Sequence, residues 1–142
     1  MKKTTFLLIG TLTIFNAYSQ DLKEKDVPPV VKSALMKQFP KATKVSWEKE
    51  KGNFEANWGG KSGEDNSAQF TPAGNFVELV ESIPVSSLPA RVAPYVSAHY
   101  KGAAIREAGK VTDAAGKHSI EVEIKGKDLI FDTEGNFVKE DK

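Results

Sequence analysis

The chain has 142 residues, no cysteine and a formal net charge of +1, with 20 lysine and arginine residues against 19 acidic residues. This near-neutral balance excludes a general nucleic-acid-binding protein and electrostatic attachment to a membrane surface. The absence of cysteine excludes disulfides, cysteine nucleophiles and thiolate metal sites.

The N-terminus has the pattern of a secretory signal peptide. Lys2 and Lys3 supply positive charge, residues 6–15 form an apolar run, and Ala17 and Ser19 are small residues spaced as a cleavage site requires. The apolar run is too short to span a bilayer, which disfavours the alternative of an N-terminal membrane anchor.

We therefore expect cleavage after Ser19 and export to the periplasm or extracellular space of a Gram-negative bacterium, without stable membrane insertion. Removal of residues 1–19 leaves 123 residues, with 18 basic and 19 acidic side chains. That length suits one compact domain or two small ones. Residues 20–25 are polar and predict a flexible lead-in.

An apolar stripe predicts a helix near the start of the mature chain. Val31, Leu35 and Phe39 recur at four-residue spacing and share one helix face. Asp26 is the expected N-cap, and Pro40 stops the helix.

The same pattern returns 61 positions later. Val92, Val96 and Tyr100 form the second stripe, and Ser87 takes the place of the N-cap. Pro94 falls inside this pattern, so we expect a kink or a detached first turn.

Two nearly identical hairpin signals are also 61 positions apart, at residues 70–77 and 131–138. Each has a phenylalanine, a tight turn with Gly74 or Gly135, and a second phenylalanine. The glycines stand where a hairpin turn needs a left-handed residue. Two copies at a fixed offset predict a duplicated unit.

Residues 45–48, 54–58 and 120–124 alternate apolar and polar side chains and predict half-buried strands. Residues 59–67 and 111–117 are expected to be loops of different length in the two halves. The fold class is α+β, with two tandem repeats of one helix plus a four-stranded antiparallel meander. The units are residues 26–83 and 84–142, with both helices on one sheet face; the sequence leaves open whether the two sheets are continuous.

The order of these motifs resembles the exported PepSY-like, beta-lactamase-inhibitor-like (BLIP-like) family of Bacteroidetes. The resemblance covers residues 26–139. The motifs that carry it are Phe39-Pro40, Trp47-Glu48, Gly74-Asn75-Phe76 and Gly135-Asn136-Phe137. The second unit departs from the pattern, because Tyr100-Lys101 stands in place of Phe-Pro and no Trp-Glu follows.

The resemblance implies a fold more than a function. The true inhibitors of this architecture bind an enzyme on the concave face of their sheet, and the PepSY name implies a peptidase-inhibitory or envelope-regulatory role. The resemblance brings no catalytic motif, and the cysteines of the true inhibitors are absent here.

The search for catalytic, cofactor and metal motifs finds none, so we expect no enzyme, no cofactor and no metal. A triad with His99 or His118 is a disfavoured alternative. Glu121 and Glu123 share one strand face and could do acid–base chemistry, although a solvated strand face is the more typical role. The acidic loop at residues 63–66 has oxygen ligands for calcium but lacks EF-hand spacing.

The uncovered sheet face is the candidate binding surface for a protein or peptide. Its expected residues are Glu48, Glu55, Asn57, Gln69, Glu121, Glu123, Lys125 and Ile130, with Thr71 and Asp128 beside them. Trp47 and Trp58 are expected in the core, and an outward-facing tryptophan would instead be an aromatic anchor.

The sequence thus predicts a non-enzymatic binding module that meets a protein or peptide in the cell envelope, with enzyme inhibition as one form of that role. The alternative is a structural or small-ligand-binding envelope protein with an apolar pocket between the two units, near Trp58 and Tyr95.

Overall fold

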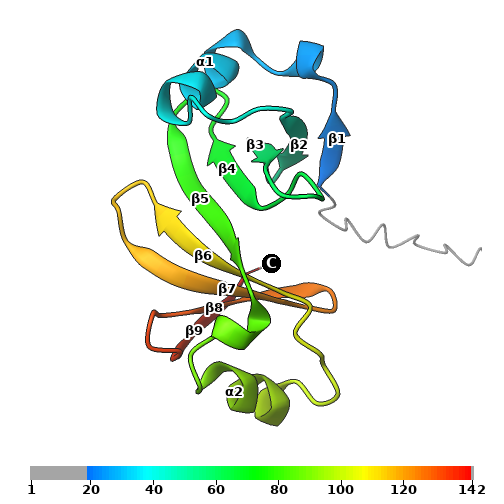
Figure 1. The fold of residues 1–142 in the computed structure, drawn as a ribbon, viewed down its shortest axis with the longest axis vertical. Coiled ribbons are helices and arrows are strands. Elements are labelled where there is room, and N and C mark those ends of the chain that lie inside the picture. Colours follow the sequence, from blue (N-terminus) through cyan, green and yellow to red (C-terminus); the bar gives the residue numbers. More distant parts are fainter. Residues whose placement is uncertain (1–18, 142) are drawn as a thin grey trace, which may run out of the picture.

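The computed structural model describes residues 19–141, so all but the last residue of the predicted signal peptide lies outside the described residues. This part of the chain forms an α+β fold with one nine-stranded antiparallel sheet and two α-helices (Figure 1). The strands are hydrogen-bonded to one another in chain order, from β1 to β9. The sheet is therefore continuous.

The strands are β1 (Gln20–Leu22), β2 (Ser46–Glu50), β3 (Asn53–Trp58), β4 (Asn66–Phe70), β5 (Phe76–Ile83), β6 (Glu107–Asp113), β7 (His118–Ile124), β8 (Lys127–Phe131) and β9 (Phe137–Asp141). The helices are α1 (Pro29–Gln38) and α2 (Val92–His99), each preceded by a short 3₁₀ helix, η1 (Glu24–Asp26) and η2 (Val85–Ser87).

The expected flexible lead-in at residues 20–25 is wrong. Gln20–Leu22 pairs with β2 as an edge strand, and Leu22 lies opposite Trp47. Leu22 is the one apolar side chain of this strand, and it packs against the first hydrophobic core. A single apolar residue among polar ones is too weak a sequence signal to predict a strand.

Helix α1 presents the predicted stripe to the sheet, because Val31 and Leu35 are buried and Phe39 follows as the C-cap. Its N-terminus differs from the prediction. Asp26 belongs to η1, and α1 begins at Pro29, where the fixed φ and missing N–H of proline suit the first helical position.

Helix α2 buries Val92 and Val96 in the same way. The predicted N-cap is wrong here too, since Ser87 ends η2 and the helix begins only at Val92. This late start places Pro94 in the first turn, where its missing N–H has no intrahelical partner to lose. Pro94 therefore does not require the kink in α2 that the sequence predicts.

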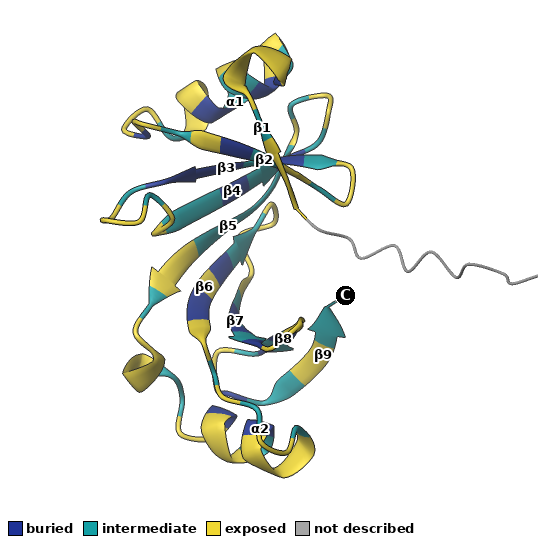
Figure 2. Cartoon of the chain, turned by 90° about the vertical axis from the view of Figure 1, so that its right-hand side faces the viewer, coloured by how far each residue is buried: buried dark blue, intermediate teal, exposed yellow. Residues whose placement is uncertain are grey.

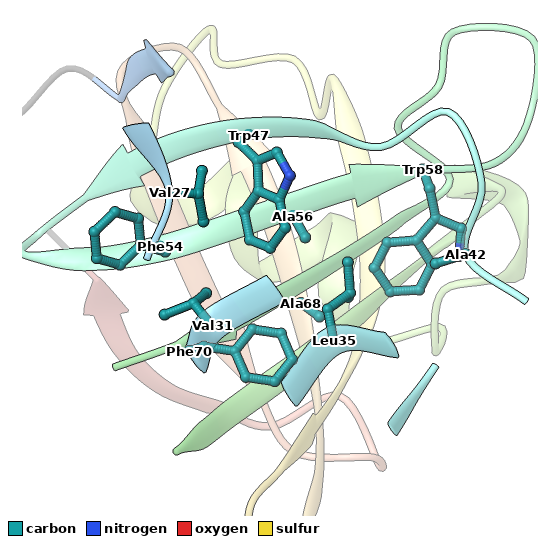
Figure 3. Close-up of a cluster of buried hydrophobic side chains, with 10 residues drawn as sticks. All are labelled: Val27, Val31, Leu35, Ala42, Trp47, Phe54, Ala56, Trp58, Ala68 and Phe70. Atoms are coloured by element: carbon teal, nitrogen blue, oxygen red, sulfur yellow. The ribbon is translucent and has the colours of Figure 1, made fainter. Parts of the chain in front are cut away.

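The first hydrophobic core lies between α1 and strands β2–β4 (Figure 3). Trp47 and Trp58 both point into it, with only 5% and 9% of their surfaces exposed. The ring of Phe39 lies 5.3 Å from that of Trp58, a tilted aromatic contact that ties the end of α1 to the sheet. Both tryptophans are core residues, and the aromatic-anchor interpretation is wrong.

The second core lies under α2 and contains residues of β7 and β8, including Val122, Leu129 and Phe131. The Tyr95 ring packs edge-on to Phe131 at 5.6 Å and stacks on Phe137 at 4.8 Å. Each helix thus has its own apolar core on the sheet, and Figure 2 shows the two helices at opposite ends of the molecule.

Both helices cover the same face of the sheet. Leu79 packs against the first core, and Ile83 lies four residues further along β5 on the same face. Ile83 is opposite Ala108 on β6, and Ala108 is opposite Val122, which belongs to the second core. Residues directly opposite in a ladder point to one side, so no helix of residues 19–141 lies on the other face.

The two predicted hairpins are confirmed. Gly74 and Gly135 have φ of +83° and +87°, and each N–H donates to the carbonyl three residues earlier. The flanking phenylalanine rings lie 5.9 Å apart in the first hairpin and 5.7 Å apart in the second. Each turn also packs against a helical segment, Gly74 against Val30 and Gly135 against Pro89.

The order of elements places four strands after α1 and four after α2. The expected loop at residues 111–117 is shorter than predicted, because β6 continues to Asp113, and β4 begins at Asn66 inside the other expected loop. Duplication of one ancestral unit stays an interpretation.

Gly135→Ala should destabilise the fold by about 1–3 kcal/mol, because a side chain at positive φ is strained and its Cβ would lie 2.8 Å from that of Pro89. Gly126→Ala is the matched control, since Gly126 also has positive φ but no atom within 4 Å of an added Cβ. Urea unfolding of both variants measures the difference. Equal losses would show that crowding against the α2 segment contributes nothing.

Candidate functional site, an acidic cleft on the helix-free face

The helix-free face is hollowed into a cleft of about 520 Å³ that is lined by strands of both sheet halves. Ten carboxylates line it: Glu48, Glu50, Glu55, Glu64, Glu78, Glu107, Glu121, Glu123, Asp128 and Asp141. We call this hollow the acidic cleft. Its volume falls within the range of about 300–1,000 Å³ that is typical of ligand pockets.

Strand register explains how the first half contributes. Glu48 on β2 lies opposite Glu55 on β3, Glu55 lies opposite Gln69 on β4, and Gln69 lies opposite Glu78 on β5. These four side chains form one row across four strands, because directly paired residues share a face.

The second half contributes a similar row. Glu107 on β6 is paired with Glu123 on β7, which is paired with Asp128 on β8 and then Asp141 on β9. Like charges directly opposite one another in a sheet are destabilising. Two such rows facing one cleft are therefore costly to fold stability, and burial adds to that cost.

A salt bridge joins the two ends of the sheet across the cleft. Lys51 Nζ, in the turn between β2 and β3, lies 3.4 Å from Asp141 Oδ1 on the last strand. Both side chains are about 40% exposed, so they stand at the rim. Among the described residues that line the cleft, Lys51 is the one basic side chain, and its charge is already shared with Asp141.

Glu50 and Glu55 lie side by side and share a neutral partner. The Gln69 amide Nε2 lies 3.2 Å from a carboxylate oxygen of each. Burial, with the adjacent Glu55 carboxylate, raises the pKa of Glu50 to about 7. This carboxyl group therefore changes its charge near neutral pH.

Glu121 has the largest shift in the cleft. Burial raises its pKa to about 8, and the charges of Asp128, Glu78 and Glu50 add to the effect. Burial is also the first cause of the raised pKa values of Glu78, Glu123 and Asp128. Glu121 is influenced by Glu50 and Glu78 of the other half, so the carboxylates of both halves act on one another across the cleft.

Asn57 is the buried polar residue of the cleft wall. Its side chain lines the cleft although only 6% of the residue is exposed. No other described residue hydrogen-bonds to its amide, and no fully sealed polar side-chain atom in residues 19–141 lacks a partner. The amide of Asn57 therefore keeps its hydrogen-bonding capacity toward the cleft.

A smaller hollow of about 230 Å³ adjoins the acidic cleft and shares Glu78, Glu121 and Asp141 with it. Its wall contains apolar side chains, Val111, Ile130 and Val138, and also polar and charged ones: Asp113, Lys117, His118, Ser119, Asp132 and Lys139. Val138 is 57% exposed, so this apolar side chain is accessible at the surface.

The sequence-predicted surface is largely assembled in one place. Six of its residues line the acidic cleft, namely Glu48, Glu55, Asn57, Gln69, Glu121 and Glu123, and Asp128 does so as well. Ile130 lies in the adjoining hollow. Lys125 lies in the exposed turn between β7 and β8 and lines neither, and Thr71 belongs to the first hairpin turn.

Sequence reasoning missed Glu50, Glu78, Glu107, Asp141 and Lys51. Glu50 could have been found, because it continues the two-residue alternation that places Glu48 outward. The contribution of Asp141 depends on how the last strand meets the turn after β2, and local patterning holds no signal for that contact.

The described residues do not support the alternatives of a histidine-containing triad, a calcium site or an apolar pocket near Trp58 and Tyr95. The His99 ring stacks on Tyr95 and its Nδ1 bonds the Tyr95 carbonyl, while His118 Nδ1 bonds the Thr112 hydroxyl. In the described part of the chain, no group of three or more histidine or acidic side chains has the arrangement of a metal site. Neither Trp58 nor Tyr95 lines the cleft or its neighbour, so the apolar pocket expected beside them is not found there.

Glu121→Gln should stabilise the protein by roughly 1–3 kcal/mol at pH 8.5. The folded-state pKa is raised, so the free energy of unfolding of the wild type falls as the pH rises from about 5 to about 8. The variant has no ionisable group at this position, so its free energy of unfolding does not fall in this way. It also lacks the repulsion between an ionised Glu121 and the surrounding carboxylates of Asp128, Glu78, Glu50 and Asp141.

Urea unfolding of the two proteins at pH 5 and pH 8.5 measures this effect. Glu134→Gln, an exposed carboxylate in the second hairpin turn, is the control and should change neither value. A Glu121→Gln variant that loses stability at pH 8.5 would contradict the account.

Comparison with known proteins identifies relatives of this fold. Residues 58–139 match the family model described as "Putative beta-lactamase-inhibitor-like, PepSY-like". The motifs Phe39-Pro40 and Trp47-Glu48 lie outside the matched region, whereas both hairpins lie inside it. No curated protein matches the chain.

Solved structures share the fold at low sequence identity. A putative periplasmic protein from Bacteroides eggerthii has a TM-score of 0.63 and 19% identity, over 81% of this chain and 88% of that one. A DUF2874 family protein from Bacteroides uniformis has a TM-score of 0.63 and 20% identity, over 80% of this chain and 88% of that one. A BLIP-like protein from Bacteroides fragilis has a TM-score of 0.57 and 18% identity, over 80% of this chain and 84% of that one.

Neither α-helix of the described chain has the length and apolar character that crossing a bilayer requires. The family match spans 82 of the 142 residues and so covers more than half of the sequence. The chain therefore belongs to the PepSY-like, beta-lactamase-inhibitor-like family.

Proposed function

We propose that this protein is an exported, non-enzymatic binding module of the bacterial envelope. It uses the acidic cleft on the helix-free sheet face to bind a protein or peptide, and inhibition of an enzyme partner is one form of that role. The architecture behind it is two tandem helix-plus-meander units, residues 26–83 and 84–142, whose strands join into one sheet.

The observation that carries this proposal is the gathering of ten carboxylates in one hollow on the face that no helix covers. Burial and mutual repulsion raise the pKa values of several of them, which is a cost to the free protein. Such unfavourable arrangements are typical of sites selected for binding rather than for stability.

A second candidate is a small-ligand-binding envelope protein. The cleft lies between the two halves of the sheet and has a volume suited to a small molecule. Its lining is mainly polar rather than apolar, which favours the surface of a polar partner instead.

Export is supported by the signal-like N-terminus and by the similar fold of the Bacteroides eggerthii protein, which is described as periplasmic. We expect the exported chain to begin at Gln20. Intact mass and N-terminal sequencing of protein from the periplasmic fraction measure this directly. A chain that keeps residues 1–19 and stays with the membranes would favour the anchor instead.

Cleft substitutions should abolish partner capture. In crosslinking from envelope extracts at pH 8.5, above the pKa of about 8 of Glu121, a partner captured by the wild type should be lost with Glu55→Gln/Glu121→Gln, because two central cleft charges are removed. The control Glu24→Gln/Glu134→Gln alters two exposed carboxylates outside the cleft and should retain it. Identical captured sets for all three proteins, by quantitative mass spectrometry, would contradict the proposed site.

A further inference from the structure

We propose that the acidic cleft binds a basic, extended segment of a protein or peptide. A lysine or arginine side chain of that segment lies between the carboxylates of the two sheet halves, and the Asn57 amide bonds it or its backbone. This inference rests on the proposed function and specifies the chemistry of the partner.

Charge complementarity is the first argument. The whole chain is close to neutral, yet ten carboxylates and one lysine line the cleft, and that lysine is paired at the rim with Asp141. The interior therefore holds negative charge without a cation of its own. A bound ammonium or guanidinium group would replace repulsion among Glu50, Glu121 and Asp128 with attraction.

Asn57 provides an independent argument. It is nearly buried and lines the cleft, and its side-chain amide has no hydrogen-bond partner among the described residues. Its amide oxygen can accept from a cationic side chain, and its NH₂ group can donate to a peptide carbonyl. A buried polar group with unused capacity favours a ligand that satisfies it.

The size and shape of the site favour a peptide over a metal ion or a small polyamine. The carboxylates are spread over a cleft of about 520 Å³, and the described residues contain no cluster with the arrangement of a metal site. The adjoining hollow has apolar side chains, Val111, Ile130 and exposed Val138, beside charged ones that include Lys117 and Lys139. The two lysines favour an apolar residue of the partner in this hollow and its basic residue in the acidic cleft. A peptide with an apolar residue next to a basic one matches both surfaces.

Isothermal titration tests the proposal with protein purified from the periplasm after export. The probe is a blocked five-residue peptide that alternates lysine and valine, and the matched peptide alternates glutamate and valine. At pH 8.5 and low salt we expect the lysine peptide to bind and the glutamate peptide not to bind. Affinity for the lysine peptide should fall at least tenfold in Glu55→Gln/Glu121→Gln and stay unchanged in Glu24→Gln/Glu134→Gln.

The pH dependence provides a second readout. Glu50 and Glu121 must lose their protons to attract a cation, in the presence of Glu55, Glu78, Asp128, Asp141 and the rim lysine Lys51. The adjoining hollow adds the charged or titratable side chains of Asp113, Lys117, His118, Asp132 and Lys139 around Glu121. Affinity should therefore be weaker at pH 6 than at pH 8.5, and binding should release protons to the buffer. Added salt should also weaken it.

Three outcomes would overturn the inference: equal binding of both peptides, lysine-peptide binding that cleft substitutions leave unchanged, or binding of spermidine or Ca²⁺ alone without the lysine peptide. If the lysine peptide fails to bind while cleft substitutions still abolish capture of an envelope partner, the basic-segment inference is wrong and the proposed function stands. If those substitutions leave both assays unchanged, both are wrong.

Discussion

Repulsion among the cleft carboxylates is the constraint on which the rest of this structure depends. Two rows of acidic side chains cross the sheet on its helix-free face, the β5–β6 ladder joins the two halves, and Lys51 forms a salt bridge with Asp141 at the rim between them. The free energy that holds them there comes from the opposite face. Under each helix lies an apolar core, with Val31 and Phe70 in one and Val92 and Phe131 in the other, all fully buried.

One face of the sheet carries the apolar cores and the other carries the carboxylates, because side chains alternate between the two faces along each strand. In strands β2 to β4, β7 and β8, apolar side chains point to a helix and the residues between them point to the cleft, so core and cleft are built from alternate residues of the same strands. A one-residue slip of register would exchange the two faces and bury the carboxylates under the helices. The hairpin glycines help to prevent such a slip, because Gly74 and Gly135 fix the turns and pack against Val30 and Pro89.

The sequence predicted the features that depend on local periodicity. The α+β class, the two buried helix stripes, both hairpins and most residues of the helix-free face were predictable, since each needs only spacing and residue type. Helix starts were not, because short segments before α1 and α2 form 3₁₀ helices that contain Asp26 and Ser87, so neither residue caps an α-helix. The number of carboxylates in the acidic cleft could not be predicted either, because the net charge of a chain does not depend on where its charged residues lie.

The central claim is that the helix-free face, and its acidic cleft in particular, is where this protein meets its partner. Backbone amide shifts of ¹⁵N-labelled protein, followed during titration with the alternating lysine–valine peptide, test it residue by residue. The account predicts shifts concentrated around Glu55, Asn57 and Glu121, on β3 and β7, with α1 and α2 nearly unchanged. Shifts confined to the helices, or to the exposed turn at Lys125, would contradict it.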